Sequence, residues 1–293
     1  MALDHELTCA LSGATHVYGI VGYPVTHSLS PLMQTVAFQY HGLDCLYVPF
    51  PVRPRQLSQA LAGAIALGIC GLNVTIPHKE AILPLLDEIS AESQFVGAVN
   101  TVAFCDGRTI GYNTDGVGFL QPLQGLGMTF ADSPACVLGA GGAARAITMA
   151  LLQAGCATLT LTNRTVARAE RLAVALQERF PDAEVRWVPF EQAASAAHDS
   201  SLIVNATSVG LHNDTTELLP DTCLHAKHVV YDIVYRPFHT PFLQAAQRRG
   251  ATVVPGIDML IGQGAEAFRI WTGHTFPMAE IRRRLRPFLH VAP

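Results

Sequence analysis

The sequence predicts an α/β protein with two domains. Its 293 residues exceed the usual size of one domain, which favours two. Short apolar runs alternate with helical segments, a pattern typical of mainly parallel sheets covered by helices. In the middle of the chain, the segment from Pro134 to Glu170 predicts a strand, a glycine turn, a helix and a second strand. The other expected elements are placed before and after this segment.

The first part of the chain supplies the elements of one α/β layer. Ser30-Pro31 is typical of a helix N-cap followed by the first helical residue. Asp106-Gly107 lies between two short β runs and is a hairpin signal. The remaining expected strands are 15–22, 45–52 and 71–76, and the expected helices are 31–41, 54–67 and 115–127.

The glycine turn has the spacing Gly139-x-Gly141-x-x-Ala144. Small residues at these positions permit a tight turn, bring backbone N–H groups close to a pyrophosphate and let the helix pack on the strand. The helix N-terminus adds partial positive charge. Such a turn also occurs as a plain connection, but the strands on both sides favour phosphate binding. The cofactor residues expected here are Gly139, Ala140, Gly141, Gly142 and Ala143.

The residues after the second strand indicate which dinucleotide binds. An NAD site usually carries Asp or Glu about 20 residues after the glycines. This chain instead has Asn163-Arg164-Thr165, with Arg168 one turn further. Two guanidiniums suit a 2′-phosphate through charge-assisted hydrogen bonds. The alternative is a solvated helix face, and we expect NADP.

Further strands complete a six-stranded Rossmann domain. They are expected at 184–189, 202–207, 228–234 and 251–254. Because ligands bind beyond the carboxyl ends of such strands, Thr207, Ser208 and Gly256 are also expected at the cofactor. For the segment from Asn205 to Gly210, a plain turn is the alternative. Helices are expected from Asp258, as a cap, to Trp271 and over 276–289.

Polar residues in the N-terminal part form candidate reactive groups. Ser28 and Ser30 are spaced to hold a carboxylate or diol together, although capping by Ser30 is an equal alternative. Lys79 is expected in the first turn of a helix begun by Pro77, where the helix dipole favours the neutral amine. It is therefore a candidate acid or base, and an ordinary surface lysine is the alternative. Asp115 would hold Lys79 and relay its proton, or serve as an ordinary N-cap.

Composition limits the class of protein. The 49% apolar content, 14% charged content and net charge of −4 describe a globular protein without the basic surface expected for nucleic acid. We expect the arginines at 282–284 and 286 to form a solvated face. The sequence shows no signal peptide or membrane span, and its seven cysteines contain no C-x-x-C pair, which favours reduced thiols and a cytoplasmic location. We expect no metal, and His225-x-x-His228 is interpreted as incidental.

Taken together and in order, eight motifs resemble the shikimate dehydrogenase family along nearly the entire chain. The motifs are Ser28-Leu-Ser30-Pro31, Asn73-Val-Thr75-Ile-Pro77-His-Lys79, Ala98-Val-Asn100-Thr, Tyr112-Asn-Thr-Asp115, Gly139-Ala-Gly-Gly-Ala143, Asn163-Arg164-Thr165, Asn205-Ala-Thr-Ser-Val-Gly210 and Gln263-Gly-Ala. The resemblance implies reversible hydride transfer between NADP and ring C3 of shikimate, without a metal. It also implies a substrate domain, 1–116 and 257–293, completed by C-terminal helices, and an NADP domain, 117–256.

The resemblance further implies residue roles. The two serines would bind the substrate carboxylate, and Lys79 with Asp115 would be the catalytic pair. The other residues implied to line the substrate site are Thr75, Asn100, Tyr235 and Gln263. Gly264 departs from the Ala of many members.

Several alternatives stay open at this point. Quinate and aminoshikimate dehydrogenases share nearly all the motifs, and a methylene-tetrahydrofolate dehydrogenase shares the two-domain plan. A non-catalytic NADP-binding regulator would make the Lys79 and Asp115 pair incidental. The expected partner is a small molecule, and both a monomer and a homodimer are compatible with the sequence.

Overall fold

The computed structural model describes residues 11–211 and 214–289. The chain divides into two compact units. Unit 1 contains the described residues up to Thr114 together with Gly264–Leu285, and unit 2 contains Asp115–Gln263 and the described residues from Arg286 onward. The assignment of substrate and cofactor to domains bounded near residues 116 and 256 stays a prediction.

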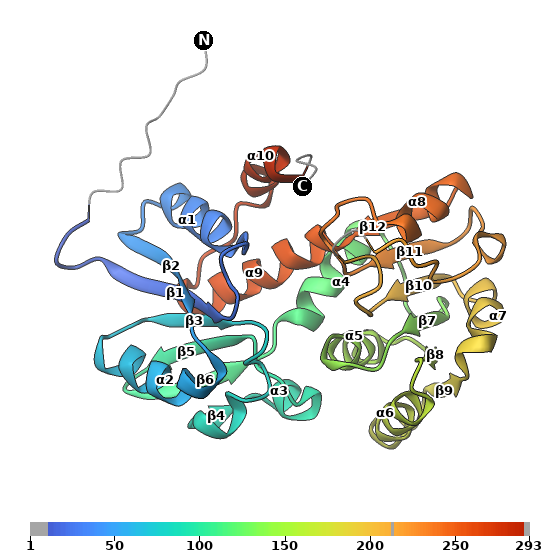
Figure 1. The fold of residues 1–293 in the computed structure, drawn as a ribbon, viewed down its shortest axis with the longest axis horizontal. Coiled ribbons are helices and arrows are strands. Elements are labelled where there is room, and N and C mark those ends of the chain that lie inside the picture. Colours follow the sequence, from blue (N-terminus) through green and yellow to red (C-terminus); the bar gives the residue numbers. More distant parts are fainter. Residues whose placement is uncertain (1–10, 212–213, 290–293) are drawn as a thin grey trace, which may run out of the picture. The chain divides into compact units, whose positions relative to one another are not determined.

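Unit 1 is built on a mixed sheet of six strands in the order β2-β1-β3-β5-β6-β4 (Figure 1). Its strands are β1 His16–Gly22, β2 Cys45–Pro51, β3 Gly71–Val74, β4 Glu88–Ile89, β5 Thr101–Cys105 and β6 Arg108–Tyr112. Its helices before Thr114 are α1 Ser30–Tyr40, α2 Leu57–Ala66 and α3 Ala91–Val96, with short 3-10 turns η1 Pro54–Gln56 and η2 Leu83–Leu85. Strands β1, β2 and β3 are parallel, as predicted, and the antiparallel pairs come from β5.

Two local features of unit 1 follow from its sequence. Asp106 and Gly107 both have positive φ, 50° and 76°, as the tight turn of the predicted hairpin requires. The second feature is a contact of β5, in which the indole of Trp271 donates to the Val102 carbonyl at 3.0 Å. Trp271 lies so close to Gly71 that a Cβ there would meet the indole Nε1 at 2.5 Å. The small residue in β3 therefore makes room for the aromatic side chain.

Unit 2 has the Rossmann topology. Its sheet runs β12-β11-β10-β7-β8-β9, which is the 3-2-1-4-5-6 order of a dinucleotide domain when counted from β7, and its strand pairs are all parallel. The strands are β7 Ala135–Leu138, β8 Thr158–Thr162, β9 Glu184–Val188, β10 Leu202–Asn205, β11 Val229–Asp232 and β12 Thr252–Pro255. The helices are α4 Asp115–Gly125, α5 Gly142–Gln153, α6 Val166–Arg179, α7 Ala193–His198 and α8 Pro241–Arg248, with turns η3 Phe190–Gln192 and η5 Asp221–Cys223. The predicted fold class is confirmed.

Burial explains why these strands are continuous apolar runs. Each residue of β7 is at most 1% exposed, and β10 is buried throughout, because helices cover both faces of a parallel sheet. The edge strand β9 is only partly buried. There, Trp187 lines a surface cleft of about 330 Å³ with Val174 and Gln177 of α6. Gln177 secures the edge because its side chain accepts from Val185 N and donates to the Ala183 carbonyl.

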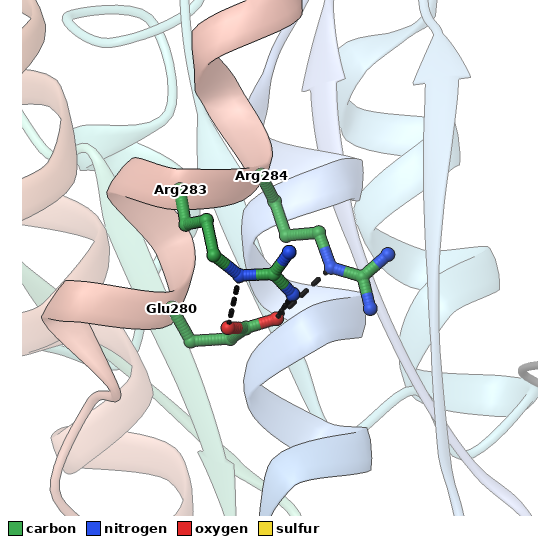
Figure 2. Close-up of polar contacts among 3 residues, drawn as sticks. All are labelled: Glu280, Arg283 and Arg284. Atoms are coloured by element: carbon green, nitrogen blue, oxygen red, sulfur yellow. Dashed lines mark hydrogen bonds and ion pairs between the residues drawn. The ribbon is translucent and has the colours of Figure 1, made fainter. Parts of the chain in front are cut away.

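Two helices follow β12. Helix α9 spans Gly256–Thr272 and α10 spans Met278–Leu289. Asp258, the expected cap of α9, instead lies inside its first turn, so the predicted cap is wrong and the helix begins at Gly256. In α10, Arg283 and Arg284 both converge on Glu280 (Figure 2), with contacts of 2.6–2.9 Å. These bonds lower the pKa of Glu280 to about 2 and neutralise part of the basic face.

The remaining sequence expectations concern membranes, thiols and metals. Within the described ranges, no helix is both long and apolar enough to cross a membrane. The six described cysteines are all free thiols, and Cys9 lies outside the described residues. His225 and His228 stack with ring centroids 3.5 Å apart, and the Nδ1 of each accepts a backbone N–H. The residues that the structure describes contain no group of three side chains suited to a metal.

Candidate active site

Ser28 and Ser30 lie together at the start of α1. The Ser28 hydroxyl accepts the backbone N–H of Ser30 at 3.2 Å. Ser30 is the first residue of the helix and Leu29 is its N-cap, without a side-chain capping bond. The expectation that Ser30 is the N-cap is therefore wrong, because the preceding serine already satisfies the Ser30 amide.

The Ser30 hydroxyl enters a buried polar network instead. The Ser30 side chain is a hydrogen-bond partner of the hydroxyl of Tyr47 in β2, and Tyr47 donates to Asn73 Oδ1 at 2.6 Å. All three residues are 4% exposed. Burial raises the pKa of Tyr47 well above its ordinary value, so this hydroxyl keeps its proton and its direction of donation. The network links α1 to the central strand β3.

The same network continues to Asn100. Asn73 donates from Nδ2 to the Asn100 carbonyl at 3.2 Å and to Thr101 Oγ1 at 3.1 Å. Thr101 then donates to Asn100 Oδ1 at 3.1 Å, and Thr114 donates to that oxygen through its backbone N–H at 2.9 Å. Unit 1 thus joins two expected substrate residues, Ser30 and Asn100, through buried hydrogen bonds whose members are all neutral.

Thr75 and Lys79 lie in the turn after β3. The Thr75 amide donates to the Val21 carbonyl at 2.9 Å, and the Lys79 carbonyl accepts from Val99 N at 2.8 Å. This places the Lys79 backbone beside the residue that precedes Asn100. The segment after Pro77 forms turns and no α-helix, so the expected helix and its dipole effect on Lys79 are wrong.

The remaining residues expected at the substrate lie in unit 2. Asp115 is the first residue of α4 and is 7% exposed, where the helix N-terminus favours a negative charge. Tyr235 follows β11, and burial raises the pKa of its hydroxyl. Gln263 is in α9 and donates to the Leu260 carbonyl at 3.1 Å. The pairing of Asp115 with Lys79 stays a prediction, because the two residues belong to different units.

The glycine turn of unit 2 has the shape that a dinucleotide needs. Gly139 has φ of +123°, and a Cβ there would meet the Ala206 carbonyl oxygen at 2.8 Å. Gly141 is the N-cap of α5, with no neighbour within 4 Å of a Cβ. Ala144 is fully buried against the strand. The turn therefore requires glycine at its first position and leaves open space at the helix N-terminus, and these residues fit a bound pyrophosphate.

The side chains after β8 fit the additional phosphate of NADP. Thr165 is the N-cap of α6, and Asn163 donates to its carbonyl at 2.9 Å. Arg164 and Arg168 are both exposed at this end of the helix. Planar guanidiniums at a strand end without an acid suit a 2′-phosphate better than a ribose hydroxyl.

Thr207 and Ser208 occupy the loop after β10, and Gly256 begins α9. Asn205 shapes the loop, because its Oδ1 accepts both the backbone N–H and the hydroxyl of Thr207, at 3.0 and 2.7 Å. A Cβ at Gly256 would overlap the Ile233 carbonyl, so close approach of the backbone after β11 requires this glycine.

Three family models match successive parts of the chain. The description "Shikimate dehydrogenase substrate binding domain" matches residues 20–102. The description "Shikimate / quinate 5-dehydrogenase" matches residues 124–233, and "Shikimate 5'-dehydrogenase C-terminal domain" matches residues 256–286. This order defines a class of two-domain dehydrogenases.

Individual relatives specify the class further. A protein named "Shikimate dehydrogenase (NADP(+))" from Geobacter metallireducens is 46% identical over 94% of this chain and 97% of its own. The Thermus thermophilus shikimate 5-dehydrogenase solved with NADP(H) and shikimate is 40% identical, with a TM-score of 0.83 over 93% of this chain and 99% of that one. A quinate dehydrogenase from Corynebacterium glutamicum solved with NAD is 30% identical, with a TM-score of 0.85 over 93% and 99%. The chain belongs to the shikimate dehydrogenase family.

Two buried polar residues, Tyr47 and Asp232, are not among the residues that the motifs predict. Tyr47 stands in the apolar strand Cys45–Pro51, where a tyrosine needs a partner for its hydroxyl when buried. Asp232 ends an apolar strand and is 0% exposed, although carboxylates are almost never fully buried without partners. Each of these residues is a polar residue within an apolar run that is predicted to be buried, and this pattern alone indicates a buried hydrogen-bonding group.

Proposed function

We propose that this chain catalyses the reversible, NADP-dependent interconversion of 3-dehydroshikimate and shikimate. The observation that carries the proposal is the likeness, along nearly the whole chain, to a protein named shikimate dehydrogenase (NADP(+)) and to one solved with NADP(H) and shikimate. It agrees with the function predicted from the motifs. Unit 1 would hold the substrate, with Tyr235 and Gln263 of unit 2 contributing, and the glycine turn of unit 2 would hold NADP.

Oxidation of the substrate hydroxyl requires removal of its proton as hydride leaves the carbon. NADP, when bound, supplies the hydride acceptor. Lys79 and Asp115 are the groups that we assign to the proton, as a coupled pair rather than as one base. Ser28 and Ser30 would orient the carboxylate, and Thr75 and Asn100 would hold ring hydroxyls.

The cofactor residues act by binding and orientation. Gly139 to Ala143 would approach the pyrophosphate through backbone N–H groups, while Arg164 and Arg168 would bind the 2′-phosphate with Asn163 and Thr165 beside them. Thr207, Ser208 and Gly256 would border the nicotinamide half. We also propose a cytoplasmic location, because the described cysteines are free thiols, as in reducing compartments.

Quinate oxidation is the second candidate, because a quinate dehydrogenase is among the relatives. Quinate has an extra hydroxyl on the carbon that bears the carboxylate. That hydroxyl would lie at Ser28 and Ser30, where a buried polar group without a partner is costly.

One assay tests the proposed function. The absorbance of NADPH is followed with shikimate, quinate and aminoshikimate, each with NADP and with NAD. Shikimate with NADP should give the highest kcat/KM. Equal or reversed values for quinate would assign the chain to a sister group, and no turnover with any member of the panel would contradict the proposal.

A further inference from the structure

The carboxylate of Asp232 joins three segments of unit 2. It lies at the end of β11 and is 0% exposed. Its Oδ1 accepts from Asn205 Nδ2 at 2.9 Å and from the backbone N–H of Val234 at 3.0 Å. Its Oδ2 accepts from the Thr240 hydroxyl at 2.6 Å. One buried side chain thus ties the loop after β10, the loop after β11 and the start of α8.

Asn205 transmits this connection to the loop that it begins. Its Nδ2, which donates to Asp232, also donates to the Val209 carbonyl at 3.1 Å. Its Oδ1 takes the two bonds from Thr207, and the Thr207 hydroxyl accepts from Val209 N at 3.1 Å. The shape of the loop from Asn205 to Gly210 therefore depends on the orientation of one amide, and Asp232 fixes that orientation by accepting from its nitrogen.

The loop lies at the position where sheets of this topology bind ligands. Strands β7 and β10 are neighbours at the point where the strand order reverses, and Leu138 is paired with Asn205. Ligands bind at such a switch point. The carbonyl of Ala206 also abuts Gly139 of the glycine turn, at 2.8 Å from a Cβ placed there. The backbone of the loop therefore packs directly against the glycine turn.

Among the residues that the structure describes, no cationic side chain forms an ion pair with Asp232. Burial raises its pKa to about 6, and the three bonds from Thr240, Val234 and Asn205 oppose that rise. Titratable or charged groups near it are Tyr231, Tyr235 and Arg236 on its own strand and loop, His239 before α8, and Asp214, which accepts from the backbone of Gly210. Within the described part of the chain, the groups that oppose the raised pKa of Asp232 are its three hydrogen-bond donors.

We propose that Asp232 is a positioning residue for the cofactor, holding the loop from Asn205 to Gly210 in the shape that receives the nicotinamide half of NADP. The inference rests on the proposed function only in the identity of the dinucleotide. Asp232→Asn is the direct test, because asparagine has nearly the same volume as aspartate. Its amide oxygen can still accept from Asn205 and Val234, but the charge is lost and so is the acceptor for Thr240.

Binding of NADPH to the protein without substrate is the first measurement. Asp232→Asn should raise the Kd for NADPH about tenfold, the loss of one hydrogen bond to a charged group. Asp182→Asn, an exposed aspartate of the same unit, is the matched control and should bind normally. The KM for shikimate should change far less than the KM for NADP.

The pH profile separates positioning from a merely structural role. In the wild type, NADPH binding should weaken as pH falls through about 6. The 2′-phosphate of the cofactor titrates near the same pH, so the relevant quantity is the difference between the profiles of wild type and Asp232→Asn. Hydrogen exchange of the Thr207 and Val209 amides in the cofactor-free protein should be faster in the variant.

A second pair of variants applies if Asp232→Asn does not fold. Thr240→Val should weaken NADPH binding, and Thr240→Ser, which keeps the hydroxyl, should restore it. Normal NADPH affinity in the variants, with the wild-type pH profile and unchanged amide exchange, would overturn the proposal. Because these measurements need no turnover, they stand apart from the substrate assay, whose failure would change the reaction and leave the role of Asp232 intact.

Discussion

The two units hold their expected binding residues in place with different kinds of buried hydrogen bond. In unit 1, neutral groups from Ser30 to Asn100 hold one another through Tyr47 and Asn73. In unit 2, a single carboxylate collects donors from three segments. A network of neutral hydroxyls and amides does not titrate near neutral pH, whereas a buried carboxylate does. The hydrogen bonds that hold Ser30 and Asn100 should therefore not change with pH near neutrality. Those that hold the expected cofactor loop should change, because they depend on the charge of Asp232.

The largest expected effect is the loss of kcat when Lys79 of unit 1 is replaced, without a loss of NADPH binding by unit 2. Lys79→Ala in unit 1 should lower kcat by about a hundredfold to ten thousandfold, the usual contribution of a general acid or base. The Kd for NADPH, measured by direct binding, should stay near the wild-type value, because the cofactor residues lie in unit 2. Lys227→Ala, an exposed lysine of unit 2, should leave kcat unchanged. A near-normal kcat for Lys79→Ala would remove Lys79 from the proton step.

The pH dependence of stability should be dominated by unit 2. The folded pKa of Asp232, about 6, is above its ordinary value of 3.8, so the fold favours the protonated form. Stability from this group is present below pH 3.8 and is lost as pH rises through about 6, with a total of about 3 kcal/mol. His228 acts in the opposite direction, because burial lowers its pKa below 6.5 and stability is lost as pH falls below that value.

Denaturant unfolding at a series of pH values checks these opposing contributions. Asp232→Asn should abolish the loss between pH 4 and pH 6 and leave a curve that declines only toward acid, first through His228 and at lower pH also through Glu280. If the curves of wild type and variant are parallel, the carboxylate of Asp232 is not the titrating group.

Cofactor selectivity should change with unit 2 alone. Arg164→Ala removes a charge-assisted contact to the 2′-phosphate and should raise the KM for NADP about tenfold to a hundredfold while leaving NAD nearly unaffected. The preference for NADP should shrink as salt is raised, because the exposed pair is screened. Arg171→Ala, in the second turn of α6 and also exposed, is the control. Equal loss of both cofactors would mean that these arginines form only a solvated helix face.

The neutral network of unit 1 makes the complementary prediction. Tyr47→Phe leaves the Asn73 and Ser30 side chains short of a partner in a buried site, which should cost about 1–3 kcal/mol of unfolding free energy. The loss should be the same at pH 5 and pH 8, and the KM for shikimate should rise with little change for NADP. Tyr40→Phe removes a hydroxyl that is on an exposed side chain (65%) and should be neutral. A pH-dependent loss in Tyr47→Phe would contradict the contrast between the two networks.

The smallest expected effects are changes in stability when either of two glycines of α9, one from each unit, is replaced by alanine. A Cβ at Gly264 would meet Gln34 Nε2 and Met33 Cε at 3.5 Å, an ordinary contact, so Gly264→Ala should stabilise the protein by about 0.4–1 kcal/mol through helix propensity. A Cβ at Gly262 would meet the Gly118 carbonyl oxygen at 2.7 Å, so Gly262→Ala should destabilise it. Thermal unfolding of both variants checks the pair, and the result for Gly264 also tests whether its departure from the family alanine matters.

Local signals were sufficient for most of the fold. The strand, glycine turn and helix around Gly139 and the Asp106-Gly107 hairpin form from residues adjacent in sequence, and the structure has both. The expected helix after Pro77 is absent because the Lys79 backbone pairs with Val99, a partner distant in the chain. Tyr47 and Asp232 were missed for the same reason, since their partners come from other strands and loops. Long-range hydrogen bonds override local preference, and one sequence does not display them.

The two tryptophans of the chain have a practical consequence for studying these contrasts. Trp187 lines the edge cleft of unit 2, and Trp271 donates to Val102 inside unit 1. Each compact unit therefore contains its own intrinsic fluorophore. Replacing either one by phenylalanine leaves an optical reporter in the other unit, so the emission of the remaining indole can follow the unfolding of one half of the chain at a time.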